Sequence, residues 1–329
     1  MRGYPGQSMN PFSNDGAVLA ALAYFDALDH PLTPLELAWY AWCWPGEGSQ
    51  DWAMSSVLAT IESLGDRVEC EEGFYVLKGR KSLIRQRKDR FLIADRKYRI
   101  AQRVTRLLAL VPFVRMVAVC NDLALSAAPD DSDIDLFVVV ESQYLWVARL
   151  WVCVLTFFQL LGPRPTPHNR RDAICLSFLA ADNALDVSVL ALPPLQDVPD
   201  VYLIYWIATL MPIYDAGGVY GSFFSANAWV ASYVPHRPVH GAYLERTVYL
   251  GRLATLIKEL IERATRICGQ WPERVSRSIQ LQIMPSTLKQ AARSGTQVIL
   301  SERYLKFHLN DRRELYRARW MERMRGLGL

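Results

Sequence analysis

Two aspartates one residue apart, Asp133 and Asp135, stand at the head of an apolar, β-branched run over residues 134–140. Such a run predicts a buried strand, whose side chains alternate between two faces. The two carboxylates therefore point to one side, while Ile134 and Leu136 enter the core on the other. Carboxylates held this close repel each other unless a cation lies between them. Their oxygens suit Mg²⁺ or Mn²⁺, so the spacing predicts a metal site, with an acidic turn before a strand as the alternative.

The elements that would position this pair are a strand before it and a helix after it. Residues 117–120 predict a second short strand, and a polar loop from Asn121 leads on to Asp133. Residues 144–161 are almost entirely apolar and approach the length of a membrane span, but Arg149 is costly in lipid. We therefore expect a buried crossover helix that covers the sheet, and no membrane partner.

This order of strand, turn, loop and Asp-Ser-Asp-Ile-Asp strand resembles the DNA polymerase beta-like nucleotidyltransferase superfamily. The resemblance implies an enzyme that moves a nucleoside monophosphate from an NTP to a hydroxyl acceptor, with Mg²⁺ (or Mn²⁺) held by Asp133 and Asp135. In that superfamily a Gly-Ser pair at the end of the first strand cradles the triphosphate. Here the pair falls on Asn121 and Asp122. We expect Asn121, Asp122 and Ser132 to contact the nucleotide, although the Asp122 carboxylate stands where a triphosphate should lie.

The resemblance also implies a third carboxylate on a later strand, as a metal ligand or a base. Residues 174–179 and 185–190 predict two strands joined by a turn. Asp186, flanked by apolar residues, fits the superfamily's pattern for this carboxylate. Alternatively, Asp186 is a strand-entry residue beside the turn, and the position belongs to Ser177, in which case the third acid is missing.

A stretch near the C-terminus, residues 303–313, is dense in groups that bind phosphate or position a nucleophile. These groups are Lys306, His308, Asn310 and Arg313. They are mixed with apolar anchors, which is more typical of a site than of a solvated face. We therefore expect these four residues to bind the nucleotide, with a polar loop before a surface helix as the alternative.

Positive charge gathers in two segments of a chain whose formal net charge is only +4. Residues 78–106 carry twelve Lys or Arg against two Asp, and residues 303–325 carry eight against three acidic residues. Such segments favour contact with nucleic acid or another polyanion. A solvated helix face is the alternative.

The first 80 residues look like a winged helix. Helices are expected to begin near Asn14, Thr33 and Asp51, and a hairpin is expected over residues 67–77. The third helix contains no Lys or Arg. A structural or protein-contact role is therefore favoured over the reading of DNA.

The order of parts over most of the chain resembles a bacterial group of nucleotidyltransferase-domain proteins with an N-terminal winged-helix-like unit. The motifs that carry this resemblance are Phe25-Asp26, Pro31-Leu32-Thr33, Cys175-Leu176-Ser177, Asn227-Ala228-Trp229 and Lys306-Phe307-His308. We expect an α+β fold with a winged-helix-like domain (1–80), a basic linker helix (81–112), a nucleotidyltransferase core with a small mixed sheet (113–195) and a helical C-terminal region (196–329).

Residues 243–267 predict a long amphipathic helix with Leu250, Leu253, Ile257 and Leu260 in its apolar stripe. We expect this stripe to pack on the core, with pairing to another chain as the alternative.

The composition limits the class of protein. Half of the residues, 51%, are hydrophobic, which excludes wholesale disorder. The six cysteines include no CxxC motif and no Cys/His cluster, so neither a zinc site nor a disulfide framework is indicated. The N-terminus shows no charged-then-apolar leader. We expect a soluble, cytoplasmic protein.

Two functions follow from these patterns. The first is a metal-dependent nucleotidyltransferase, which the intact Asp-Ser-Asp-Ile-Asp motif favours. The second is a catalytically inactive protein of the same fold that serves as a nucleic-acid or protein-binding module. The replaced Gly-Ser pair and the uncertain third acid favour the second function.

Overall fold

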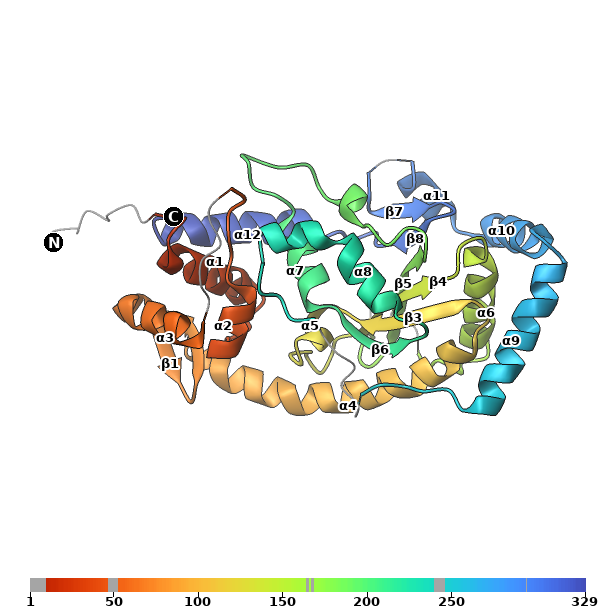
Figure 1. The fold of residues 1–329 in the computed structure, drawn as a ribbon, viewed down its shortest axis with the longest axis horizontal. Helices are drawn as coiled ribbons and strands as arrows, with labels where there is room; N and C mark the ends of the chain where they lie inside the picture. Colours follow the sequence, from red (N-terminus) through yellow and green to blue (C-terminus); the bar gives the residue numbers. More distant parts are fainter. Residues whose placement is uncertain (1–9, 47–52, 164–165, 167–168, 240–245, 294) are drawn as a thin grey trace.

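The computed structural model describes residues 10–46, 53–163, 166, 169–239, 246–293 and 295–329 (Figure 1). The fold is α+β, with a six-stranded mixed sheet, a two-stranded sheet and helices around them. The helices are α1 (Asn14–Ala27), α2 (Pro34–Tyr40), α3 (Met54–Ser63), α4 (Ser82–Leu110), α5 (Asn121–Ala124), α6 (Leu145–Phe157), α7 (Val201–Thr209), α8 (Val219–Ala226), α9 (Arg252–Ile267), α10 (Trp271–Ile283), α11 (Ser286–Ala291) and α12 (Arg313–Gly326). The strands are β1 (Val68–Glu71), β2 (Phe74–Leu77), β3 (Val114–Val119), β4 (Ile134–Val140), β5 (Ile174–Ala181), β6 (Met211–Asp215), β7 (Val298–Leu300) and β8 (Tyr304–Phe307).

The N-terminal helices begin at side chains that cap them. The Ser13 hydroxyl accepts a backbone N–H of the first turn of α1, and Thr33 forms a capping box with Glu36 at the start of α2. The predicted hairpin is confirmed as the antiparallel pair β1–β2. The third helix begins at Met54, while Asp51 lies outside the described residues.

Helix α1 joins this N-terminal part to the rest of the molecule. It contacts the C-terminal helix α12, and the two helices lie side by side in Figure 1. The Trp320 indole N–H of α12 donates to the carbonyl oxygen of Ala20 at 2.8 Å. The ring of Tyr24 stacks on Tyr205 of α7, with 4.1 Å between ring centroids. Helices α1, α2 and α3 therefore share one hydrophobic core with α7 and α12.

The large sheet has the strand order β6-β3-β4-β5-β8-β7. Strands β4 and β5 pair in parallel, and the other neighbours pair antiparallel. A parallel pair needs a crossover connection, which α6 provides between β4 and β5, as predicted. None of the helices in the described ranges has the length and apolar character needed to cross a bilayer.

Within the described residues, the region 196–329 contains six α-helices, but it also supplies three strands of this sheet, β6, β7 and β8, which the sequence did not predict. Strand β6 contains Pro212, which suggests a turn in sequence, but β6 is an edge strand, where proline is tolerated. Strands β7 and β8 are too short for an alternating pattern to reveal them. The strand predicted over residues 185–190 is also wrong, because a short 3₁₀ turn forms at Ser188–Leu190.

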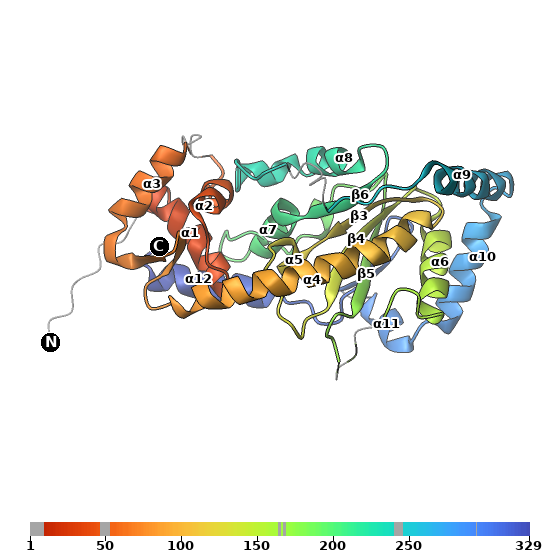
Figure 2. The same ribbon diagram turned by 90° about the horizontal axis from the view of Figure 1, so that it is seen from below.

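Helices cover both faces of the large sheet. Along β4, Leu136 and Val138 pack in the core that includes α4 and α6, whereas Phe137 and Val139 pack in the core that includes α1 and α7. Figure 2 shows α4 running along the molecule beneath the sheet. Because side chains two apart share a face, Asp135 lies on the side of Phe137. The candidate site is therefore expected on the α7 side.

Candidate active site

A cavity of about 420 Å³ lies on the α7 side of the sheet, between α1, α5, α7 and the start of α12. Nine of the ten residues that the sequence predicts for the site line it: Asn121, Asp122, Ser132, Asp133, Asp135, Lys306, His308, Asn310 and Arg313. The tenth, Asp186, does not line it. The fold thus brings predicted residues from distant parts of the sequence around one space.

Asp133 and Asp135 form an acidic group at the beginning of β4. Their carboxylate oxygens and the Cys175 sulfur of β5 lie within 4.8 Å of one another, because Asp135 pairs with Cys175 in the parallel ladder. Asp133 accepts a hydrogen bond of 2.7 Å from Arg170, and Asp135 accepts one of 2.8 Å from the Asn121 side-chain amide. Within the described ranges, no third carboxylate joins this group.

The electrostatics of this group suit a hard divalent cation. Burial raises the pKa of Asp135, and repulsion from Asp133 raises it further. Burial also raises the pKa of Cys175, so that its thiol is neutral at pH 7. A neutral thiol is a poor ligand for Mg²⁺, whereas carboxylate oxygens are preferred ones. The donor set fits Mg²⁺ or Mn²⁺ through the two aspartates, with further ligands left to a substrate.

Asn121 and Asp122 open the short helix α5 directly after β3. Asn121 has a φ of 57°, in the left-handed region that asparagine tolerates better than most other residues. Its side-chain amide joins Asp135 to the Tyr202 hydroxyl, which donates to the Asn121 oxygen at 2.8 Å. Burial, together with the nearby Asp135, raises the pKa of Asp122 to about 6. Asp122 is therefore still mostly ionised at neutral pH, where it repels phosphate.

The structure does not bring Asp186 to the acidic group. Asp186 is exposed, and its carboxylate accepts a hydrogen bond of 2.9 Å from the backbone N–H of Ser188. The residue that does line the cavity is Ser177 of β5, whose hydroxyl lies 2.9 Å from Nε2 of His308. Burial lowers the pKa of His308 to about 4, so its ring is neutral at pH 7.

Lys306 and Arg313 line the cavity but are buried and bound to protein groups. The Lys306 ammonium donates to the carbonyl oxygen of Thr296 at 2.9 Å, and burial lowers the pKa of Lys306 to about 8. The Arg313 guanidinium binds both carboxylate oxygens of Asp311 and also Asp200. These contacts anchor the segment between β8 and α12 against the cavity.

Lys97 of α4 fastens the loop that carries Asp133. Its side chain is 0% exposed, and its ammonium donates to the carbonyl oxygens of Ser132 at 2.7 Å and of Asp130 at 3.2 Å. It also binds the Asp172 carboxylate at 3.0 Å. A residue of the predicted basic helix therefore holds the acidic loop in place.

Many cations of the basic segments 78–106 and 303–325 take part in ion pairs within the protein. The paired cations include Arg80, Arg87, Lys88, Arg96, Lys97, Arg99, Arg313 and Arg323. Much of the positive charge therefore serves internal contacts, and the contact with nucleic acid stays a prediction.

Sequence reasoning misses Arg170, Arg312, Tyr202 and Tyr316, all of which line the cavity. Arg170 precedes β5 in a basic loop, and Arg312 is the exposed neighbour of Arg313, so proximity to predicted residues is the signal that could have found them. The rings of Tyr202 and Tyr316 stack with centroids 5.4 Å apart. No local motif links these two tyrosines, because they come from α7 and α12.

The cavity combines an acidic end at Asp133 and Asp135, cations at Arg170 and Arg312, and an aromatic wall that includes Tyr202. This combination suits a phosphorylated ligand with an aromatic part that binds together with a divalent cation. The chain matches no protein-family model, no curated protein and no solved structure.

Proposed function

We propose that the protein is a metal-dependent nucleotidyltransferase with a polymerase beta-like core. The observation that carries the proposal is the pair Asp133 and Asp135, which shares one cavity with Asn121 at the end of β3 and with the cations Arg170 and Arg312. In the reaction, an acceptor hydroxyl oxygen bonds to the α-phosphorus of an NTP, pyrophosphate leaves, and the hydroxyl proton is released.

Each group in the cavity has a defined task in this proposal. Asp133 and Asp135 would hold Mg²⁺, which when bound neutralises charge on the phosphate oxygens. Asn121 fixes the orientation of the Asp135 carboxylate through their hydrogen bond. The ion pair of Arg170 with Asp133 involves a half-exposed guanidinium, so its replacement by a phosphate contact costs little. Arg312, which is exposed, adds a second cation for the triphosphate.

The acceptor side of the cavity is formed by Ser177 and His308. Because the His308 ring is neutral at pH 7, one of its nitrogens can accept a hydrogen bond from the acceptor hydroxyl. The Ser177 hydroxyl orients the ring through their contact of 2.9 Å.

We interpret the N-terminal helices and hairpin as a winged-helix-like unit with a structural role. Tyr24 and Phe25 of α1 and Leu28, which follows this helix, line the cavity, so this unit contributes a wall of the site. Helix α3 has no Lys or Arg with which to bind a phosphate backbone.

A transfer assay tests the proposal. The protein would be incubated with each α-³²P-labelled NTP and Mg²⁺ or Mn²⁺, beside an Asp133→Ala/Asp135→Ala variant. We expect label to move to protein, RNA or a small molecule with the unaltered chain alone. An absence of transfer with every NTP and acceptor pool, together with no metal-dependent nucleotide binding, would contradict the proposal.

A second candidate is a catalytically inactive protein of this fold that binds nucleic acid or protein. Two observations favour it: the Asp122 carboxylate in the phosphate-facing loop, and the lack, within the described ranges, of a third carboxylate beside the pair. Fluorescence anisotropy with a labelled single-stranded RNA separates the two functions. Tight RNA binding that is unchanged by Mg²⁺ and by Asp133→Ala/Asp135→Ala, without transfer, would support the second.

A further inference from the structure

Helix α9 packs with its polar face toward the protein and its apolar face toward solvent. The buried residues of α9 are Lys258 and Glu262. The apolar stripe is exposed instead, with Leu253 72%, Leu260 63% and Ile267 87% exposed. The expectation that this stripe packs on the core is therefore wrong for Leu253, Ile257 and Leu260, whereas Leu250, which precedes α9, does pack on the core.

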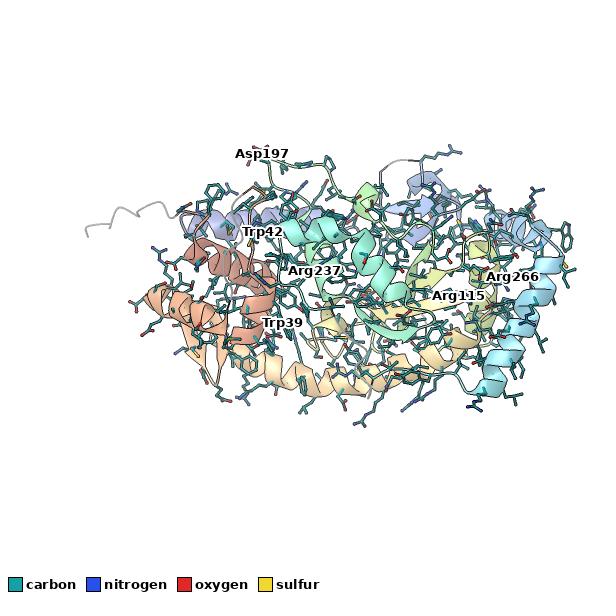
Figure 3. The ribbon with its side chains drawn as sticks, in the orientation of Figure 1. Trp39, Trp42, Arg115, Asp197, Arg237 and Arg266 are labelled. Atoms are coloured by element: carbon teal, nitrogen blue, oxygen red, sulfur yellow. The ribbon has the colours of Figure 1, made fainter. Side chains whose placement is uncertain are left out.

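Buried charge contacts fix α9 in this orientation. The Lys258 ammonium donates to the carbonyl oxygens of Ala109 at 2.8 Å and Val114 at 2.7 Å. Glu262 accepts a hydrogen bond from Arg115, and Arg266 binds Glu141 at the edge of the same contact (Figure 3). A rotation that buried the apolar stripe would leave buried polar partners unpaired, which is costly. The buried polar contacts beneath α9 therefore keep its apolar stripe exposed to solvent.

Helix α10 continues the same arrangement. Its buried residues are Ser276 and Gln280, and Gln280 donates to the carbonyl oxygen of Trp146 in α6 at 2.8 Å. We define the α9–α10 face by its exposed apolar side chains: Leu253, Leu256, Ile257, Leu260, Ile261, Ile267, Trp271, Ile279 and Ile283. Figure 1 shows both helices at the end of the molecule opposite the N-terminal helices, so the face is remote from the cavity.

The exposed apolar area of the α9–α10 face is as large as that of a protein–protein interface. Its side chains expose on the order of 1,000 Å² of apolar surface, more than the few hundred Å² usual for one patch on a monomer. A specific interface buries roughly 800 Å² on each partner. The exposed apolar area of the α9–α10 face is therefore comparable to the area that one partner buries in a specific interface.

The spacing of the apolar residues within the face indicates that its binding partner is a helix with the same apolar pattern. Leu253, Ile257, Leu260 and Ile267 follow one another at spacings of four, three and seven residues, which is the seam of paired helices. An exposed Glu259–Arg263 ion pair, 3.8 Å apart, lies on the polar side of the helix, outside the seam.

We propose that the α9–α10 face binds a second copy of this chain in a symmetric dimer in which the apolar seam of one α9 packs against that of the other. The proposal is independent of the chemistry in the cavity.

Analytical ultracentrifugation of the full chain tests this proposal. We expect the unaltered protein to sediment at twice the chain mass of 37.5 kDa at micromolar concentration. The Leu253→Glu/Leu260→Glu variant should be a monomer with unchanged circular dichroism, since both side chains are exposed in the single chain. The matched control is Leu92→Glu on α4, where Leu92 is 73% exposed, and it should remain dimeric.

Three results would overturn the dimer proposal itself. The first is a monomer at 100 µM of the unaltered chain. The second is a dimer that persists in Leu253→Glu/Leu260→Glu, which would place the interface elsewhere. The third is a monomer that sediments with anionic phosphatidylserine vesicles through this face, which would assign the face to a lipid surface.

Discussion

At the scale of single residues, Asp122 is a carboxyl group that lines the cavity, where its negative charge would oppose a bound phosphate. Its pKa is raised from an ordinary value of 3.8 to about 6 by burial and by Asp135. The folded state therefore binds this proton more tightly than the unfolded state does. The stability that Asp122 contributes is complete below about pH 4 and is lost as the pH rises through about 6.

Replacement of Asp122 by asparagine should remove the loss of folding stability that occurs as the pH rises through about 6. We expect Asp122→Asn to raise the free energy of unfolding by about 1–3 kcal/mol above pH 6 and to leave it unchanged near pH 4. Urea unfolding at the two pH values measures this difference. A stability difference that is equal at both pH values would show that the carboxyl is not responsible.

Arg170 donates a hydrogen bond of 2.7 Å to Asp133, one of the two proposed metal ligands. We expect Arg170→Gln to weaken the binding of an Mg²⁺–NTP analogue about tenfold, because a charge-assisted hydrogen bond to phosphate is lost. The neighbouring Arg171→Gln is the matched control, since Arg171 pairs with Asp130 at 3.3 Å and does not line the cavity. Calorimetric titration gives both affinities, and an equal loss in the two variants would count against a specific role of Arg170.

The sequence predicts much of the site at this scale because its residues follow local patterns. The spacing of Asp133 and Asp135 on a strand is a local pattern, and the structure brings their oxygens together. The prediction for Asp186 depends on a strand over residues 185–190 that does not form. Whether such a segment becomes a strand is decided by tertiary packing and not by its local sequence. Tyr202 and Tyr316 could not be predicted, since only the fold makes them neighbours.

At the scale of elements, the loop before β4 depends on helix α4. Lys97→Met removes the buried ammonium and leaves the carbonyl oxygens of Asp130 and Ser132 without this donor. We expect a loss of about 3–5 kcal/mol in the free energy of unfolding. The control is Arg99→Met on the same helix, whose ion pair with Asp95 is exposed and should change stability by less than about 0.5 kcal/mol.

Urea unfolding compares the two variants, and 1-anilinonaphthalene-8-sulfonate fluorescence reports loosening of the loop region. Similar stabilities of Lys97→Met and Arg99→Met would show that Lys97 does not support the acidic loop.

Elements with strong local signals could be predicted, and short edge elements could not. Thr33 and Pro34 specify the start of α2, and in the structure Thr33 caps this helix and also forms a capping box with Glu36. Strand β6 could not be predicted because Pro212 indicates a turn. The proline is tolerated because β6 is an edge strand, and this position is known only from the order of the strands in the sheet. The apolar stripe of α9 indicates a helix but not which way it faces, because buried Lys258 and Glu262 decide that.

At the scale of the whole molecule, the N-terminal helices α1 and α2 share one hydrophobic core with α7, α12 and one face of the large sheet. Trp42 packs against Trp320 of α12 with 5.2 Å between ring centroids, and Tyr24 stacks on Tyr205. We expect a single cooperative unfolding transition, with tryptophan fluorescence and far-ultraviolet circular dichroism giving the same urea midpoint. Trp320→Ala should lower the free energy of unfolding by about 3–5 kcal/mol, and both probes should report the same decrease.

An unfolding curve with two separate transitions, only one of them sensitive to Trp320→Ala, would contradict this view. It would favour the division of the chain at residue 80 that the sequence suggests.

The central claim is that Asp133 and Asp135 hold a divalent cation that binds an NTP. The most direct measurement is calorimetric titration of α,β-methylene ATP and the three corresponding analogues into the protein, with Mg²⁺ and then with EDTA. We expect binding of at least one analogue in Mg²⁺, none in EDTA, and none by Asp133→Asn/Asp135→Asn. The matched control Asp186→Asn, altered outside the cavity, should bind like the unaltered chain. Binding that survives EDTA and the double substitution, or no binding of any analogue, would contradict the claim.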